Sequence, residues 1–287
     1  MSLFADAEEW QLECAAQTWA GLAYGARSDP PALCLHGWLD NAGSLVPLVR
    51  RLSGRRYWLP DFPGHGWSGH RPEGSWYHFV DLVSDVMGLA GCLGLDRFDL
   101  IGHSMGGAIA SLIAGAFPER IGKLVLIEAI GPMSRAPEHT PADLRKAVEA
   151  RLAVADKQLK VHPDRDSAVR ARMAANELSR TAAEHLVERA LMPVAGGYVW
   201  RSDPRQTLPS PLRGTEEQWL AVLRAVQAPT QILLADPPTP YLSGPSADRR
   251  IEALRPLQLD RGPGGHHLHL EEAERVAPLI QAFLDQP

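Results

Sequence analysis

The feature that most constrains the fold of this chain is an apolar strand pattern that leads, through Gly-His-Ser-Met-Gly, into an apolar helix pattern. The strand pattern covers 97–104, and the helix pattern covers 105–117. A sharp turn between a strand and a helix is crowded, so it needs small residues two positions before and after the residue at its tip. Gly102 and Gly106 stand at those positions around Ser104. The pattern therefore predicts a tight turn that exposes the Ser104 hydroxyl.

The chain alternates between strand patterns and helix patterns. Compact apolar runs typical of buried strands occur at 31–37, 55–61, 97–104, 122–128, 231–236 and 256–260, and helical periodicity occurs at 78–93, 105–117, 215–227 and 271–285. Strands that alternate with helices of roughly 10–15 residues indicate βαβ units and a parallel sheet. We expect an α/β fold with a mostly parallel central sheet flanked by helices, preceded by a strand hairpin over 9–24.

The alternation is interrupted after Gly131-Pro132. Residues 141 to about 192 are rich in Ala, Arg and Glu, and they have helical periodicity with no strand pattern between them. The buried-strand pattern returns at 231. We therefore expect a core of 1–131 and 226–287, interrupted by a helical insertion over 132–225.

Charge and composition exclude several classes of protein. The chain has 29 basic and 34 acidic side chains, a net charge of −5, whereas nucleic-acid binders gain affinity from Lys and Arg. No segment reaches the ~18 apolar residues of a membrane span. The first residues are acidic, unlike a secretory signal, so we expect a cytoplasmic location. The spacing of Cys14, Cys34 and Cys92 matches no metal or redox motif, and we expect three reduced thiols.

Two further motifs supply groups that a serine nucleophile needs. His36-Gly37-Trp38 follows a strand pattern, and the backbone N–H groups of Trp38 and Met105 are candidates for an oxyanion hole. A serine hydroxyl also needs a general base. We favour His266, which follows two glycines at 264–265. A metal site that includes the neighbouring His267 and His269 is not favoured, because no further ligand set completes it.

The third member of a Ser-His-acid arrangement has two candidates. Glu128 closes an apolar strand pattern, where an unpartnered carboxylate would be costly to bury. Asp236 closes a later strand pattern, but it precedes Pro237 and is therefore also typical of a turn. We favour Glu128 as the acid and keep Asp236 as the alternative.

With these motifs, the chain resembles the α/β-hydrolases over nearly its whole length. Family signatures are matched in family order by the segments at 35–44, 61–68, 101–107 and 264–277. The residues in these segments most resemble those of the serine hydrolase-like proteins of this fold. The insertion would then be a cap domain. The segment 127–132 also resembles haloalkane dehalogenases, whose acid is a Glu after this strand. Their nucleophile is an Asp followed by a Trp, however, so Ser104 and Met105 argue against dehalogenation.

The resemblance implies a serine hydrolase that cleaves an ester or related acyl bond of a small molecule. Ser104 would be the nucleophile, His266 the base and Glu128 the orienting acid, with no metal or organic cofactor. The same residues could serve carbon–carbon bond or lactone hydrolysis, or acyl transfer, because fold and triad do not choose among these reactions. A non-catalytic binding protein of the same fold is the alternative outside enzymes. Nothing in the sequence predicts the oligomeric state.

Overall fold

The computed structural model describes residues 3–154, 159–256 and 258–287. The strands are β1 Glu8–Cys14, β2 Gln17–Tyr24, β3 Pro31–Leu35, β4 Arg56–Pro60, β5 Phe98–His103, β6 Ile121–Ile127, β7 Leu191–Val194, β8 Gly197–Trp200, β9 Thr230–Asp236 and β10 Gln258–Pro263. The α-helices are α1 Val46–Val49, α2 Asp81–Cys92, α3 Met105–Ala116, α4 Thr140–Ala153, α5 Arg165–Asn176, α6 Arg180–Ala190, α7 Glu216–Arg224, α8 Pro245–Leu254, α9 Leu268–Glu271 and α10 Ala273–Leu284.

Eight strands form one sheet in the order β1-β2-β4-β3-β5-β6-β9-β10. The pairs β1–β2 and β2–β4 are antiparallel, and every later pair in the order is parallel. The expected N-terminal hairpin is β1–β2. The expected mostly parallel α/β sheet is confirmed; the part of the strand prediction at residue 257 lies outside the described residues.

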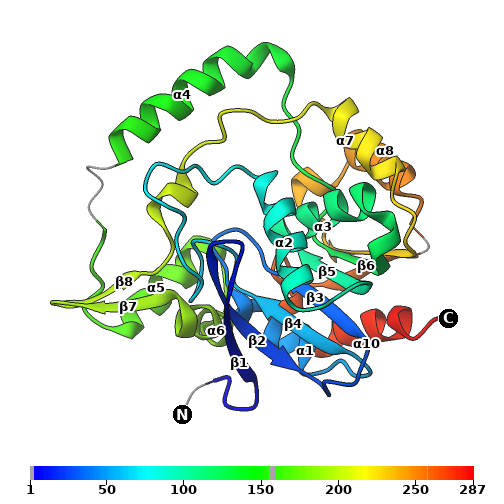
Figure 1. Cartoon of the computed structure of the whole chain (residues 1–287), viewed down its shortest axis with the longest axis horizontal. Helices are drawn as coiled ribbons and strands as arrows, with labels where there is room; N and C mark the ends of the chain where they lie inside the picture. Colours follow the sequence, from blue (N-terminus) through cyan, green and yellow to red (C-terminus); the bar gives the residue numbers. More distant parts are fainter. Residues whose placement is uncertain (1–2, 155–158, 257) are drawn as a thin grey trace.

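Alternate residues of the central strands enter two separate cores. Leu124 and Leu126 of β6 pack in the core that also contains α2 and α3, whereas Val125 and Ile127 pack in the core that contains α1 and α10. Successive side chains of a strand point to opposite faces of a sheet, so a continuous apolar run is buried on both faces. Figure 1 shows helices on both sides of the sheet. This arrangement fixes the carboxyl ends of the parallel strands, where the candidate site lies.

The chain between β6 and β9 contains more than helices. Helices α4, α5 and α6 lie there as expected, but β7 and β8 form an antiparallel hairpin that the sequence analysis did not predict. The expectation of helix is therefore wrong at 191–192, and also at 159–164, where His162 forms an isolated β-bridge with Tyr198. The hairpin turns at Ala195-Gly196, where the positive φ of Gly196 suits a tight strand reversal. Figure 1 shows the hairpin projecting at the left and α4 at the top, apart from the sheet. The helical prediction over 155–158 lies outside the described residues.

A buried ion pair fastens this inserted segment to the sheet. Arg189 of α6 donates to Asp61 Oδ2 at 2.7 Å, and both side chains are almost fully buried. Asp61 also accepts hydrogen bonds from the backbone of Ala42 and of Trp67. A buried carboxylate with this many donors is compensated for its loss of water. The ion pair therefore fixes α6 relative to the loops that follow β3 and β4.

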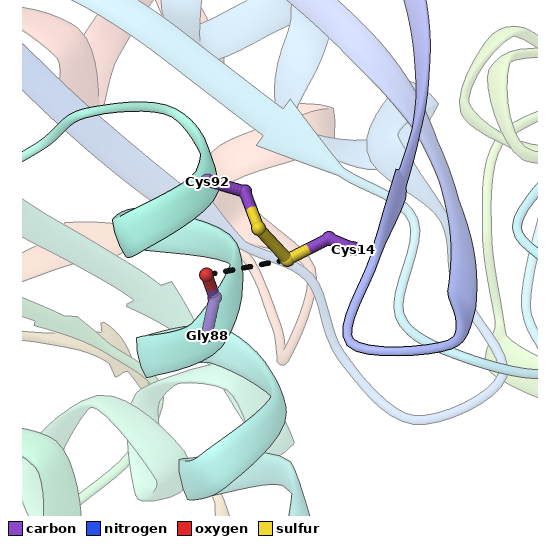
Figure 2. Close-up of a disulfide and its surroundings, with 3 residues drawn as sticks. All are labelled: Cys14, Gly88 and Cys92. Carbon is purple, nitrogen blue, oxygen red and sulfur yellow. Dashed lines mark hydrogen bonds between the residues drawn. A yellow bond between two sulfur atoms is a disulfide. The ribbon is translucent and has the colours of Figure 1, made fainter.

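The expectation of three reduced cysteines is wrong for two of them. Cys14, at the end of β1, and Cys92, at the end of α2, form a disulfide, and Figure 2 shows it joining the two elements. Their 78-residue separation hid this pairing, because it depends on how α2 packs beside the first hairpin. Cys34 is a buried free thiol. Disulfides are typical of oxidising compartments, so the cysteines no longer support the predicted cytoplasmic location, which stays a prediction.

None of the helices in the described residues combines the length and the apolar character that crossing a membrane requires.

Candidate active site

Ser104 occupies the tip of the turn between β5 and α3 in a strained conformation. Its φ is 51° and its ψ is −116°, outside the regions that a serine commonly adopts. The strain is held by hydrogen bonds on both sides: Ser104 N–H donates to Ile127 O at 2.9 Å, and Ser104 O accepts from Ala108 N–H at 2.9 Å. The turn therefore has the geometry that the sequence pattern predicted.

The glycines that flank this turn leave no room for a side chain. A Cβ atom at Gly102 would lie 2.5 Å from the Gly106 carbonyl oxygen, and one at Gly106 would lie 2.2 Å from the Leu35 carbonyl oxygen. Because both obstacles are backbone atoms, they cannot rotate away. The close approach of α3 to β5 thus depends on Gly102, and its close approach to the end of β3 depends on Gly106.

His266 lies in the loop between β10 and α9 and faces Ser104. Its Nε2 is 2.8 Å from Ser104 Oγ. The neighbouring ring of His103 holds the backbone of this loop, because His103 Nε2–H donates to the His266 carbonyl oxygen at 2.7 Å. Burial lowers the pKa of His103 well below its ordinary value, so this ring is neutral and carries its proton on Nε2.

Glu128 follows β6 directly and is fully buried. Its Oε2 is 3.1 Å from His266 Nδ1 and accepts a second hydrogen bond from Thr239 Oγ1, while its Oε1 accepts from Ala235 N–H at 2.7 Å. Burial by itself raises the pKa of Glu128, but the hydrogen bonds from His266, Thr239 and Ala235 outweigh it, and the pKa is lowered. The group is therefore a carboxylate at neutral pH, which places the His266 proton on Nδ1 and leaves Nε2 to accept the Ser104 proton.

Asp236, the alternative acid, lies elsewhere. Its side chain is exposed at the last position of β9. Within the described residues, no hydrogen bond or ion pair joins it to His266. The structure thus brings Ser104, His266 and Glu128 together and leaves Asp236 outside the group.

The two backbone N–H groups expected to form an oxyanion hole are available for a ligand. Met105 is the first residue of α3, where a helical N–H has no partner within the helix. Trp38 follows the turn after β3, and its indole N–H donates to Gln206 O at 3.0 Å. No acceptor for either backbone N–H occurs in the part of the chain that the structure describes. His36 fixes the turn, since its Nε2 accepts from Phe62 N–H at 3.0 Å and its Nδ1–H donates to Gly37 O at 2.7 Å.

A buried cluster behind His266 was not predicted. Asp40 Oδ2 lies 3.3 Å from His267 Nε2 and 3.8 Å from His103 Nδ1, and Asp40 Oδ1 accepts from Arg172 of α5. The ring of His269 lies against the ring of His103, with centroids 3.9 Å apart and the planes tilted by 36°. Among the described residues, no group of three or more His, Cys, Asp or Glu side chains is arranged to hold a metal ion. The cluster joins the loops that carry Ser104, His266 and Trp38 to the inserted segment.

Tyr241 is a second residue that the sequence analysis missed. Its hydroxyl is 3.2 Å from His266 Nδ1 and 3.4 Å from His266 Nε2. Nothing local marks it, since it follows a run of prolines and a threonine at 237–240. Asp40 had a weak signal, a carboxylate close behind the His36-Gly37-Trp38 turn.

This fold and this arrangement define the class of the protein. The chain belongs to the α/β-hydrolase fold family, whose model matches residues 30–273. It is similar to a serine hydrolase-like protein of Danio rerio, with 33% identity over 274 residues that cover 92% of this chain and 84% of that protein.

Solved structures agree with this assignment. The crystal structure of a hypothetical protein from Pseudomonas aeruginosa PAO1 matches with a TM-score of 0.93 and 41% identity, over 97% of this chain and 100% of that chain. A thioesterase domain from the curacin biosynthetic pathway matches with a TM-score of 0.84 and 27% identity, over 96% of this chain and 99% of that chain. The family and these relatives support a hydrolase.

Proposed function

We propose that the protein is a serine hydrolase that cleaves an ester or related acyl bond of a small molecule through an acyl-enzyme on Ser104. The observation that carries the proposal is the continuous contact from Ser104 Oγ to His266 Nε2, at 2.8 Å, and from His266 Nδ1 to the Glu128 carboxylate, at 3.1 Å. A nucleophile, a base and an orienting acid within hydrogen-bond reach form the arrangement that activates a hydroxyl.

In the acylation half of the reaction, Ser104 Oγ attacks the substrate carbonyl carbon while His266 Nε2 takes its proton. Glu128 holds the imidazole in the required tautomer and stabilises the imidazolium that forms. The backbone N–H groups of Trp38 and Met105 donate to the oxygen that becomes negatively charged. Each such donor contributes roughly 100- to 1,000-fold in rate. The imidazolium then protonates the leaving group, and the acyl group remains on Ser104.

In the second half, His266 takes a proton from water, which attacks the acyl carbon and releases the acid. The same two N–H groups stabilise the second tetrahedral intermediate. The likeness to a thioesterase domain supports a reaction at an acyl group, because thioesters and oxygen esters share the carbonyl chemistry of this scheme.

We also propose that residues 132–225 form a cap over the core made by the remaining residues. The position of this segment between β6 and β9 supports the division, since both strands end at the site. The ion pair of Arg172 with Asp40 supports contact between the cap and the site's loops. The cap would contribute to the substrate pocket.

The test is a screen of p-nitrophenyl esters of increasing acyl length against the wild type and Ser104→Ala. We expect turnover of some chain lengths by the wild type and a loss of several orders of magnitude in the variant. Esterase activity that survives in folded Ser104→Ala would contradict the proposal. Activity only on a lactone, on a carbon–carbon bond or with an acyl acceptor other than water would replace the ester class. No turnover of any of these substrates and no covalent labelling of Ser104 would favour a binding protein.

A further inference from the structure

The loop after β9 supplies two hydroxyl groups to the proposed triad. The loop contains three prolines within 237–240 and no carboxylate. Thr239 Oγ1 donates to Glu128 Oε2, and the Tyr241 hydroxyl lies against the ring of His266. A short turn, in which Leu242 N–H donates to Thr239 O at 2.8 Å, sets the spacing of the two side chains. One loop therefore contacts both the acid and the base.

The Tyr241 hydroxyl is not the main partner of either ring nitrogen. Its oxygen is almost equally far from Nδ1 and Nε2 of His266, at 3.2 and 3.4 Å, so it lies beside the part of the ring between them. Nδ1–H is directed to Glu128 and Nε2 to Ser104. The phenolic oxygen also lies within hydrogen-bond reach of Ser104, and its O–H can donate to a further group next to Nε2.

The protonation state and the exposure of the Tyr241 phenol also allow it to act as a hydrogen-bond donor. Burial and the nearby charge of Glu128 raise the pKa of Tyr241 to about 12, despite the opposing effect of a side-chain hydrogen bond with Ser104, so the phenol keeps its proton at neutral pH. The residue as a whole is 54% exposed, so it is accessible from solvent. A substrate atom that takes the proton of His266 Nε2 lies within hydrogen-bond distance of that nitrogen, which is itself 3.4 Å from this hydroxyl, so the hydroxyl can reach it.

We infer that Tyr241 is a further catalytic residue, which donates a hydrogen bond to the leaving-group oxygen of an ester; this inference rests on the proposed acyl-enzyme function. When the tetrahedral intermediate collapses, the bond between the acyl carbon and the leaving oxygen breaks, and its electron pair goes to that oxygen. His266 Nε2–H supplies the proton. Tyr241 keeps its own proton and only shares it. The products are acyl-Ser104 and the free alcohol.

This role favours a particular class of substrate. A hydrogen bond that strengthens as charge develops contributes most where the leaving group cannot stabilise that charge itself. An alkoxide has no such stabilisation, whereas p-nitrophenolate spreads its charge over the ring. The site is therefore suited to alkyl esters.

The test compares two esters of the same acid, an ethyl ester and a p-nitrophenyl ester, with wild type and Tyr241→Phe. The value of kcat/KM reports acylation, the step in which the leaving group departs. We expect Tyr241→Phe to lose about tenfold in kcat/KM on the ethyl ester, the size of one hydrogen bond to a developing charge. On the p-nitrophenyl ester we expect less than about a twofold loss.

Tyr24→Phe is the matched control, because its hydroxyl contacts Asp6 at 3.5 Å and no residue of the site. It should leave both values unchanged. An equal loss on the two esters would overturn the inference in favour of a positioning role, and no loss on either would overturn it outright. If the wild type hydrolyses no ester of any acyl length, the proposed function fails and the inference with it; if the wild type is active and only the selective loss is missing, the proposed function stands.

Discussion

The carboxylate of Glu128 and the imidazole of His266 lie 3.1 Å apart, between Oε2 and Nδ1, although 138 positions separate them in the chain. Glu128 follows β6 and His266 follows β10, and β9 lies between these strands in the sheet. The chain at and after β9 completes the contact, because Ala235 N–H and Thr239 Oγ1 also donate to the carboxylate. Three donors thus converge on one buried anion.

Because three donors converge on the Glu128 carboxylate, we predict that Glu128→Gln will strongly lower turnover. An amide has one acceptor oxygen, and its NH₂ group must face a donor among His266, Thr239 and Ala235, so the imidazole loses its tautomer and its counter-charge. The equivalent change in a serine protease lowers kcat about ten-thousand-fold. We expect a loss of that order in ester hydrolysis, with the fold retained by circular dichroism.

Asp236→Asn is the matched control for this variant. Its exposed carboxylate has no contact with His266 among the described residues, so we expect most of the activity to remain. An active Glu128→Gln together with an inactive but folded Asp236→Asn would move the acid to β9. If both variants stay active, the site works without an orienting carboxylate.

The three histidines that follow Gly265 should differ sharply in their effect on turnover. His266→Ala removes the proposed base, and we expect kcat to fall by several orders of magnitude. His267 and His269 are buried and contact Asp40 and His103 rather than Ser104, so their replacement by Ala should lower stability and leave most of the turnover per folded molecule. Steady-state kinetics with thermal melts separates these effects. A loss at His267 equal to that at His266 would contradict the assignment.

Asp40 should make a large, pH-dependent contribution to stability. Asp40→Asn leaves the partly buried Arg172 and the buried His267 without their anion, and breaking a buried pair in this way costs about 3–5 kcal/mol. Burial by itself raises the pKa of Asp40, but the close contact with His267 and the charge of Arg172 outweigh it, and the pKa is lowered. Its contribution is therefore full above the ordinary pKa of 3.8 and is lost as the pH falls through the lower folded value.

Urea unfolding of the wild type and Asp40→Asn at a series of pH values measures this contribution. The difference in unfolding free energy should be large above pH 3.8 and should shrink below it. Asp6→Asn is the control, since Asp6 forms an exposed ion pair with Arg50 and should contribute at most about 1 kcal/mol. Equal costs for the two variants would mean that the buried pair does not form.

The turn at Ser104 should not tolerate a side chain at Gly106. Gly106→Ala places a Cβ atom 2.2 Å from the Leu35 carbonyl oxygen, and we expect a loss of roughly 1–3 kcal/mol in unfolding free energy and a fall in turnover. Gly88→Ala is the control, because open space surrounds that position in the middle of α2. It should stabilise the protein by roughly 0.5–1 kcal/mol. A Gly106→Ala variant as stable and active as wild type would contradict the packing described for α3.

Much of the fold could be predicted because it depends on local pattern. The runs that became β5, β6 and β9 each contain consecutive apolar residues, Leu100–Ile101, Leu124–Ile127 and Ile232–Ala235, which is what burial on both faces requires. Ser104 was recognisable from its flanking glycines. Glu128 was recognisable because a lone carboxylate at the end of such a run needs a partner.

The features that were missed depend on contacts between distant segments. The disulfide joins residues 78 positions apart, and the partners of Asp40 come from α5 and from the loop after β10. Tyr241 is recognisable as a residue of the site only from the contact between the loop after β9 and His266. The β7–β8 hairpin did carry a local signal in its two adjacent glycines, but the helical composition of the preceding residues concealed it.

Covalent labelling of Ser104 tests the central proposal most directly. The native protein is incubated with a fluorophosphonate, digested and analysed by mass spectrometry, with His266→Ala treated in parallel. We expect one adduct per chain, on the peptide that contains Ser104, and much slower labelling of the variant because its hydroxyl has no base. A folded protein that hydrolyses esters while Ser104 stays unmodified would contradict an acyl-enzyme on this residue.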